Sequence, residues 1–167
     1  MHARSVYSLI LVACGAGMLA GCGATVDTFA VRPEDTPLRW DRAMASMPFL
    51  LHFPDGRMVA YDQDGRPWPG VHANDLSHIS GHVEMFVGPF QATGSPMCSA
   101  HPTLSRVEAG ARIPNLAVVL CDHERAVDAF SDTVPVTTLG APATLTAHAR
   151  QLLLEGIQDS SAQQPEI

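Results

Sequence analysis

The first 21 residues constrain this chain most, because they have the pattern of a leader that is removed before the remainder folds. Arg4 supplies a positive charge, an apolar run extends from Val6 to Ala20, and small residues close it. These are the three parts of an export signal. A bilayer-spanning helix needs roughly 20 apolar residues, and this run is shorter and contains Gly15 and Gly17. We therefore expect residues 1–21 to direct the protein out of the cytoplasm.

The run ends in Leu19-Ala20-Gly21-Cys22, which resembles the lipobox of bacterial lipoproteins. In that family the cysteine thiol receives a diacylglyceryl group, a peptidase cuts just before the cysteine, and the new amino terminus is usually acylated, for example with palmitate. The resemblance implies that Cys22 carries the lipid and becomes the first residue of the mature protein. Two or three acyl chains anchor a protein stably. With cleavage elsewhere, Cys22 would instead be a free or disulfide-bonded thiol.

The residue after the cysteine bears on the final membrane. In enteric lipoproteins an aspartate at this position holds the protein at the inner membrane, whereas this chain has Gly23. The resemblance therefore favours the periplasmic face of an outer membrane.

Composition narrows the partners of the mature chain, Cys22 to Ile167, whose length suits one domain. Nine arginines stand against seventeen carboxylates once the leader is removed, so nucleic acid and anionic lipid headgroups are expected to be poor partners for this acidic surface. The sequence contains no lysine, which excludes Schiff-base chemistry, a P-loop lysine and a Ser-Lys dyad. It has no GxGxxG or phosphate loop either, so no nucleotide partner is expected.

Two cysteines remain after the anchor, Cys98 and Cys121. In an oxidising compartment an even pair predicts a disulfide. Two buried free thiols are the alternative.

Hydrophobic patterns predict an α+β domain that is mostly β, a small antiparallel sheet or sandwich with a short N-terminal helix and a C-terminal helix packed on it. Thr36-Pro37 has the residues of an N-cap and first helical position, and Trp40, Met44 and Met47 follow on one apolar face. A second helix begins at Pro142 and is expected to end at Gly156. We expect a lipidated tether over 22–35, one globular domain over 36–157 and a disordered tail over 158–167.

Between the helices the period changes to that of strands. The predicted strands cover 49–53, 57–61, 82–90, 104–108, 116–121, 126–130 and 134–139. The strand at 116–121 is the most apolar and is expected to be central, while Pro135 favours an edge position for 134–139. Residues 122–130 also suit a helical turn. Tyr61 to Gly70 resembles the strand-turn segment of bacterial transthyretin-like and carboxypeptidase-regulatory-like sandwiches.

Histidines provide the candidate metal ligands. His72, His78 and His82 lie within eleven residues, and the last two have the i, i+4 spacing of helical zinc sites. Ile79-Ser80-Gly81 between them is poor in helix formers, and HExxH is absent. We therefore assign no metal or other cofactor, and keep these three histidines as the alternative ligand set.

No complete catalytic set is evident from the sequence. GxSxG is absent. Cys98 and His101 could form a thiol nucleophile and its base, but the expected disulfide would remove the nucleophile. The prediction is a non-catalytic, lipid-anchored envelope protein with a structural or accessory role, binding another envelope component. Periplasmic metal binding and a small envelope hydrolase are the alternatives.

Overall fold

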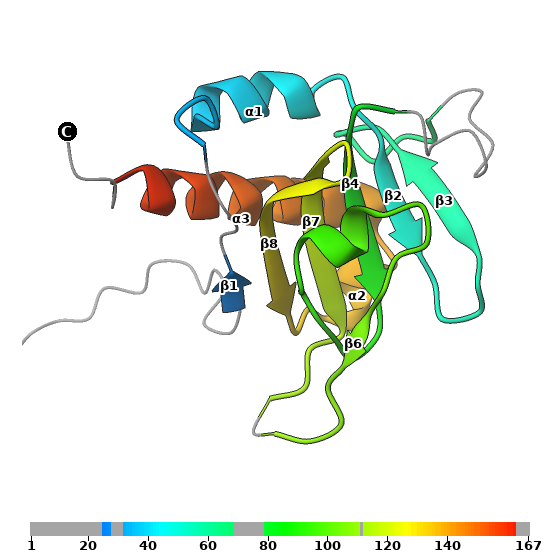
Figure 1. Ribbon diagram of the computed structural model, residues 1–167. Helices are drawn as coiled ribbons and strands as arrows, with labels where there is room; N and C mark the ends of the chain where they lie inside the picture. The colour runs from blue at the N-terminus through cyan, green and yellow to red at the C-terminus, as the bar shows by residue number, and fades with distance from the viewer. Residues whose placement is uncertain (1–24, 28–31, 69–78, 111, 163–167) are drawn as a thin grey trace, which may run out of the picture.

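The computed structural model describes residues 25–27, 32–68, 79–110 and 112–162, so the leader and Cys22 lie outside the described residues. Figure 1 shows the elements in this part of the chain. The strands are β1 (Thr25–Asp27), β2 (Phe49–His52), β3 (Met58–Tyr61), β4 (Gly81–Val87), β5 (Phe90–Gln91), β6 (Ser105–Arg106), β7 (Leu116–Asp122) and β8 (Arg125–Asp132). The helices are α1 (Pro37–Met44), the 3-10 helix η2 (Ser95–Cys98), α2 (Val136–Leu139) and α3 (Pro142–Ala162).

Six strands form one sheet in the order β1-β8-β7-β4-β2-β3, and β5 pairs with β6 in a small second sheet. All the pairings are antiparallel except that of β2 with β4, which is parallel. The predicted α+β class with mostly β structure is confirmed. The sheet is mixed rather than purely antiparallel because the chain between β3 and β4 carries β4 to the far side of β2.

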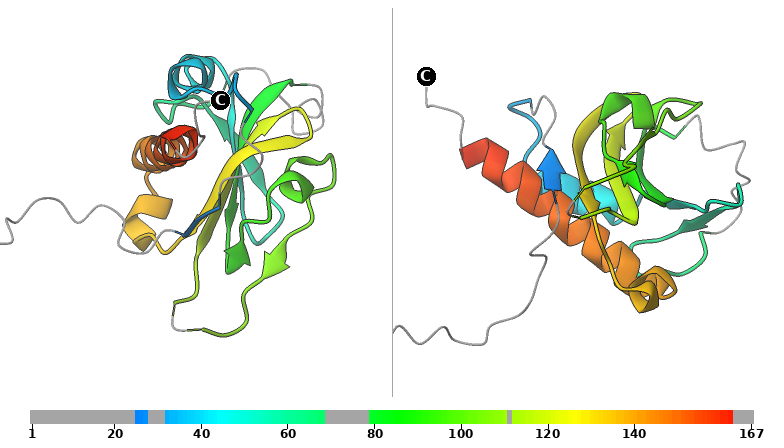
Figure 2. Two further views of the ribbon diagram at one scale, coloured as in Figure 1. Left: turned by 60° about the vertical axis from the view of Figure 1, so that its left-hand side comes forward. Right: turned by 90° about the horizontal axis from the view of Figure 1, so that it is seen from below.

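The molecule has three layers, which Figure 2 shows edge on. The helices α1, α2 and α3 lie on one side of the large sheet, and η2 with the β5–β6 pair lies on the other. The C-terminal helix packs on the sheet as predicted, and the N-terminal helix lies on the same face.

The strand β7 shows why the predicted central strand is so apolar. Leu116, Val118 and Leu120 belong to the cluster on the helix side. Ala117, Val119 and Cys121 alternate with them and belong to the cluster on the opposite side. All six residues are fully buried, since helices cover one face and η2 the other. A strand covered on both faces reads as a continuous apolar run.

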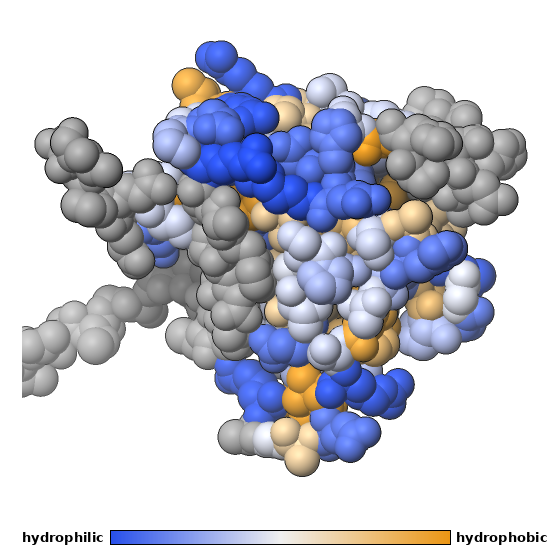
Figure 3. Space-filling model, viewed as in Figure 1, coloured by the Kyte–Doolittle hydropathy of each residue, from blue (hydrophilic) through white to orange (hydrophobic). Residues whose placement is uncertain are grey.

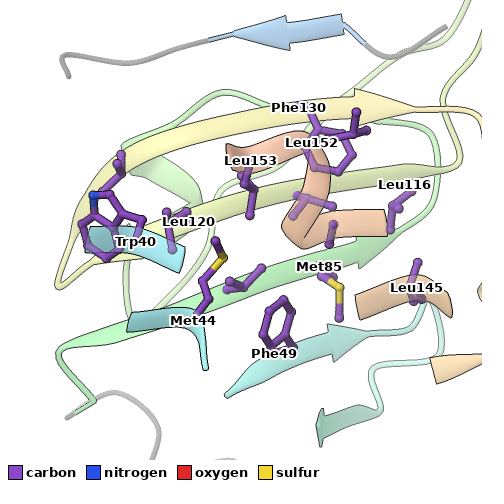
Figure 4. Packing of buried hydrophobic residues seen from close by; sticks show 14 of the residues in the cluster. Trp40, Met44, Phe49, Met85, Leu116, Leu120, Phe130, Leu145, Leu152 and Leu153 are labelled. Atoms are coloured by element: carbon purple, nitrogen blue, oxygen red, sulfur yellow. The ribbon is translucent and has the colours of Figure 1, made fainter. Parts of the chain in front are cut away.

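The main core lies between the sheet and the helices (Figure 4). Trp40 and Met44 of α1 and Leu153 of α3 meet Phe49 of β2 and Phe130 of β8 in one buried cluster. The helix α1 begins as predicted, because the Thr36 side chain accepts a hydrogen bond from the Arg39 backbone N–H and Pro37 follows the cap.

The segment 134–139 was predicted as an edge strand, and this is wrong. Val136–Leu139 is the short helix α2, and the Thr138 and Leu139 backbone N–H groups donate to the Pro135 carbonyl. Its β-branched residues favour a strand locally. The place of this segment in the fold overrides that preference, because the chain must turn here from the end of β8 into α3.

The predicted helix end at Gly156 is also wrong, since α3 continues to Ala162. Glycine inside a helix costs only about 1 kcal/mol relative to alanine. Ile157, the next residue, is completely buried in the main core. Burying that side chain offsets the cost, so residues 158–162 are helical and not part of a disordered tail.

The segment predicted as a tether is partly structured. Thr25, Val26 and Asp27 form β1, which pairs with Ser131, Phe130 and Ala129 of β8. Three residues without a visible period gave no strand signal, and only the open edge of β8 provides the pairing. Within the described part of the chain, no helix has the length and apolar character that a bilayer crossing requires.

Candidate functional site

The most unusual polar cluster in the described residues lies on the face of the sheet opposite the helices. His52 ends β2, while His82 and Glu84 are two residues apart on β4. Alternation along a strand puts residues i and i+2 on one face. The parallel register pairs Leu50 with Glu84 and His52 with Phe86, which brings His52 diagonally beside Glu84.

The two imidazoles contact the same carboxylate, each at a different oxygen. His52 Nε2 hydrogen-bonds to Glu84 Oε2, and His82 Nε2 lies 3.4 Å from Glu84 Oε1. The His52 ring also stacks on Phe86, with centroids 4.5 Å apart and planes 14° from parallel. We call these residues, His52, His82 and Glu84, the His-Glu-His cluster.

The three side chains of the cluster differ in their exposure to solvent. The side chains of His82 and Glu84 are each 9% exposed, whereas that of His52 is 27% exposed. His82 Nδ1 is buried and has no hydrogen-bond partner among the described residues. His52 is therefore the member that solvent and solutes reach.

Glu84 stays ionised in spite of its burial. Removal from water favours the neutral acid and raises its pKa, but the hydrogen bonds and positive charge that His52 and His82 can supply outweigh this effect. The pKa of Glu84 consequently lies below its ordinary value.

The arrangement can hold and orient two imidazoles, and the cysteine paired with it is not available as a nucleophile. Cys121 is the residue opposite His82 on β7, and its sulfur is bonded to Cys98. A sulfur in a disulfide is not a thiolate and cannot attack a substrate. In the described ranges, no group of three or more His, Cys, Asp or Glu residues has the geometry to hold a metal ion. Both Nε2 atoms are already directed at the Glu84 carboxylate.

The predicted disulfide is confirmed. Cys98 of η2 and Cys121 of β7 are joined with Sγ atoms 2.07 Å apart and Cα atoms 5.6 Å apart. The bond fastens η2 to the centre of the sheet, inside the smaller buried cluster.

The predicted histidine set is only partly described. His82 is on β4 as stated, while His72 and His78 lie outside the described residues, as does the lipidation candidate Cys22. The structure brings His82 together with His52 and Glu84, two residues that sequence reasoning missed. The alternation His82-Val83-Glu84 was a usable signal for the pair on β4. Nothing local could indicate His52, which is 32 residues away from Glu84 and depends on the β2–β4 pairing.

A second buried polar group, also missed, joins α1 to the start of β8. The Asp35 carboxylate accepts two hydrogen bonds from the Arg125 guanidinium, at 2.7 and 3.1 Å, and one from Trp40 Nε1 at 2.9 Å. Its side chain is completely buried. Burial raises the pKa of Asp35, but the hydrogen bonds from Arg125, Arg32 and Trp40 hold it below the usual value. We call this the Asp35 ion pair, and its role is structural.

Comparison of the chain with protein-family models, with curated proteins and with solved structures finds no match.

Proposed function

We propose that this protein is a lipid-anchored component of the bacterial cell envelope whose exported domain has a non-catalytic, structural or accessory role. Cys22 carries the lipid, the domain lies on the periplasmic face of the outer membrane, and it binds another envelope component.

The observation that carries the proposal is the buried Cys98–Cys121 disulfide. Structural disulfides persist in oxidising compartments and are rare in the cytosol. A bond of this kind is what an exported domain would contain. It therefore supports the interpretation of residues 1–21 as a leader, and the leader ends at the lipobox cysteine.

The polar clusters support a non-catalytic role. The imidazoles of the His-Glu-His cluster face the Glu84 carboxylate, and the Asp35 carboxylate is occupied by four hydrogen bonds. These groups are used to join strands and helices to one another.

Metabolic labelling with an alkyne analogue of palmitate tests the anchor. The wild-type protein should be labelled and should fractionate with the outer membrane, and Cys22→Ser should abolish both. The matched control is Cys98→Ser with Cys121→Ser, which removes two cysteines and should keep the label. Label that persists in Cys22→Ser, or a wild-type protein recovered in the soluble periplasm, contradicts the proposal.

The accessory role needs a separate test. A pull-down from crosslinked membranes should recover the same envelope component repeatedly with the wild-type protein. The Cys22→Ser form, which is not held at the membrane, should recover much less of it. Equal recovery with both forms would show that anchoring does not serve the interaction.

One observation favours a second candidate function, the binding of zinc or copper by His72, His78 and His82. His82 Nδ1 is a buried ring nitrogen without a hydrogen-bond partner among the described residues, and a neutral imidazole nitrogen is a good ligand for both metals. Equilibrium dialysis would detect stoichiometric uptake that His82→Ala abolishes. His101→Ala, which alters an exposed histidine, is the control. Uptake that depends on His82 would contradict a purely structural role.

A further inference from the structure

The position of β1 determines which end of the domain can face the membrane. Thr25, the first residue of β1, pairs with Ser131 near the end of β8. Only three residue steps separate Thr25 from Cys22. A chain spans at most about 3.6 Å per residue, so the acylated cysteine lies within roughly 11 Å of Thr25. The lipid therefore enters the bilayer close to the end of the sheet where β8 stops.

In the part of the chain that the structure describes, three large apolar side chains are exposed, and two of them lie at this same end. Val136 is 80% exposed on α2, which begins four residues after β8 ends, and Ile113 is 44% exposed in the segment before β7. The two segments are joined by hydrogen bonds, since Thr133 Oγ1 donates to the Ile113 carbonyl at 3.1 Å and Asn115 Nδ2 to the Val134 carbonyl at 2.8 Å.

The third exposed apolar residue provides a contrast. Leu38 is 59% exposed on α1, which is fastened to the opposite end of β8 through the Asp35–Arg125 ion pair. In the left view of Figure 2, α1 lies at the top, while α2 and the segment between β6 and β7 lie at the lower side. The strand β8 separates the two ends by its eight residues, about 23 Å.

The segment between β6 and β7 differs in charge from the chain as a whole. The segment from Arg106 to Arg112 contains these two exposed arginines and one carboxylate, Glu108, although the chain carries a formal charge of −7. Figure 3 shows hydrophobic residues among hydrophilic ones at the lower end of the molecule, where the β6–β7 segment lies. Apolar side chains beside arginine match a membrane interface, where the former enter the acyl boundary and the latter meet phosphate groups.

We propose that this end of the domain, formed by Ile113, Val136, Arg106 and Arg112, docks on the lipid surface in which Cys22 is anchored. The inference rests on the lipidation proposed above. The short link through β1 holds the domain in place, and the two apolar side chains enter the headgroup region of the same leaflet. The Leu38 end points away from the membrane.

A site-directed fluorescence experiment tests the docking. Ile113→Cys, Val136→Cys and Leu38→Cys are prepared in the lipidated protein, labelled with an environment-sensitive dye, and reconstituted on vesicles of phosphatidylethanolamine and phosphatidylglycerol. We expect a blue shift and quenching by headgroup spin-labelled lipid at 113 and 136, with neither change at 38. Leu38 is a matched control because it is an apolar residue of comparable exposure at the other end.

Vesicle flotation separates the two proposals. If the labelled proteins float with the vesicles but the dyes at 113 and 136 keep their aqueous spectra, or the dye at 38 shifts as much, the docking surface is wrong and the anchor stands. If the proteins do not float and carry no acyl group, the anchor is wrong and the docking surface is refuted with it.

Discussion

The Asp35 ion pair gives the sharpest stability prediction. In Asp35→Asn the side chain keeps its size but loses its charge and one acceptor oxygen. The native carboxylate accepts from the Arg32 backbone N–H, Trp40 Nε1 and two nitrogens of Arg125. One oxygen receives two of these bonds and the other receives the remaining two. Whichever way the amide turns, two bonds are lost and an N–H group faces two donors.

The cost can be estimated from the surroundings of the pair. Removing one partner of a buried ion pair typically costs 3–5 kcal/mol, roughly, because the other charge stays buried without compensation. Arg125 is 18% exposed and keeps its bond to Asp122 at 2.8 Å, which places the loss at the lower end, about 3 kcal/mol. Asp55→Asn is the matched control, since Asp55 also pairs with an arginine, Arg57, but both side chains are more than half exposed. Its unfolding midpoint should hardly move.

Urea unfolding of the oxidised, unlipidated Cys22→Ser protein, followed by tryptophan fluorescence, measures both variants. The pKa of Asp35 is lowered in the folded state, so the ion pair contributes fully above the ordinary value of 3.8, and that contribution is lost as the pH falls through the folded pKa. The difference in free energy of unfolding between the wild type and Asp35→Asn should therefore be largest at neutral pH and become smaller in acid. A loss no larger than that of Asp55→Asn at neutral pH refutes the reasoning.

Three further predictions follow from single features of the fold. Removing the Cys98–Cys121 disulfide, which closes a loop over a separation of 23 residues, should cost roughly 3 to 4 kcal/mol on the chain-entropy account, and reduction of the wild type should give the same loss in urea unfolding. Because the pKa of Glu84 is lowered in the fold, the stability that its ionised form contributes is present above pH 4.5 and is lost in acid. The free energy of unfolding of Glu84→Gln should therefore fall less steeply with decreasing pH than that of the wild type. Gly65→Ala should lower the thermal unfolding midpoint several-fold more than Gly56→Ala. Both glycines have positive φ, but only at Gly65 would the new Cβ meet backbone, 2.2 Å from the Ala143 nitrogen of α3. A larger drop for Gly56→Ala would contradict this close packing of the Gly65 turn against α3.

Local sequence signals were sufficient for elements whose cause is local. The start of α1 follows from Thr36 and Pro37, and the centrality of β7 follows from an apolar run that only a strand covered on both faces can have. The disulfide was predictable from the number of cysteines and from the expectation of an oxidising compartment. In these cases the local residue pattern is enough to indicate the environment that each residue has in the fold.

The remaining features depend on contacts between distant residues. Val136–Leu139 has strand-forming residues but becomes a helix, because the chain must turn there from the end of β8 into α3. His52 reaches Glu84 only through the parallel register of β2 and β4, and Asp35 meets Arg125 across 90 residues. A buried carboxylate gives no local signal of its own, because the partner that makes its burial tolerable is chosen by topology.

If Cys22 is lipidated as proposed, the pairing of β1 also limits how far the domain can reach from the membrane. A free tether over 22–35 could extend by roughly 45 Å and let the domain work well away from the bilayer. With Thr25 held on β8, the free link shrinks to about 11 Å. On the proposed anchoring, the partner must then come to the membrane surface, because the domain cannot leave it unless β1 detaches. This favours a component embedded in or lying on the same membrane over one located across the periplasm.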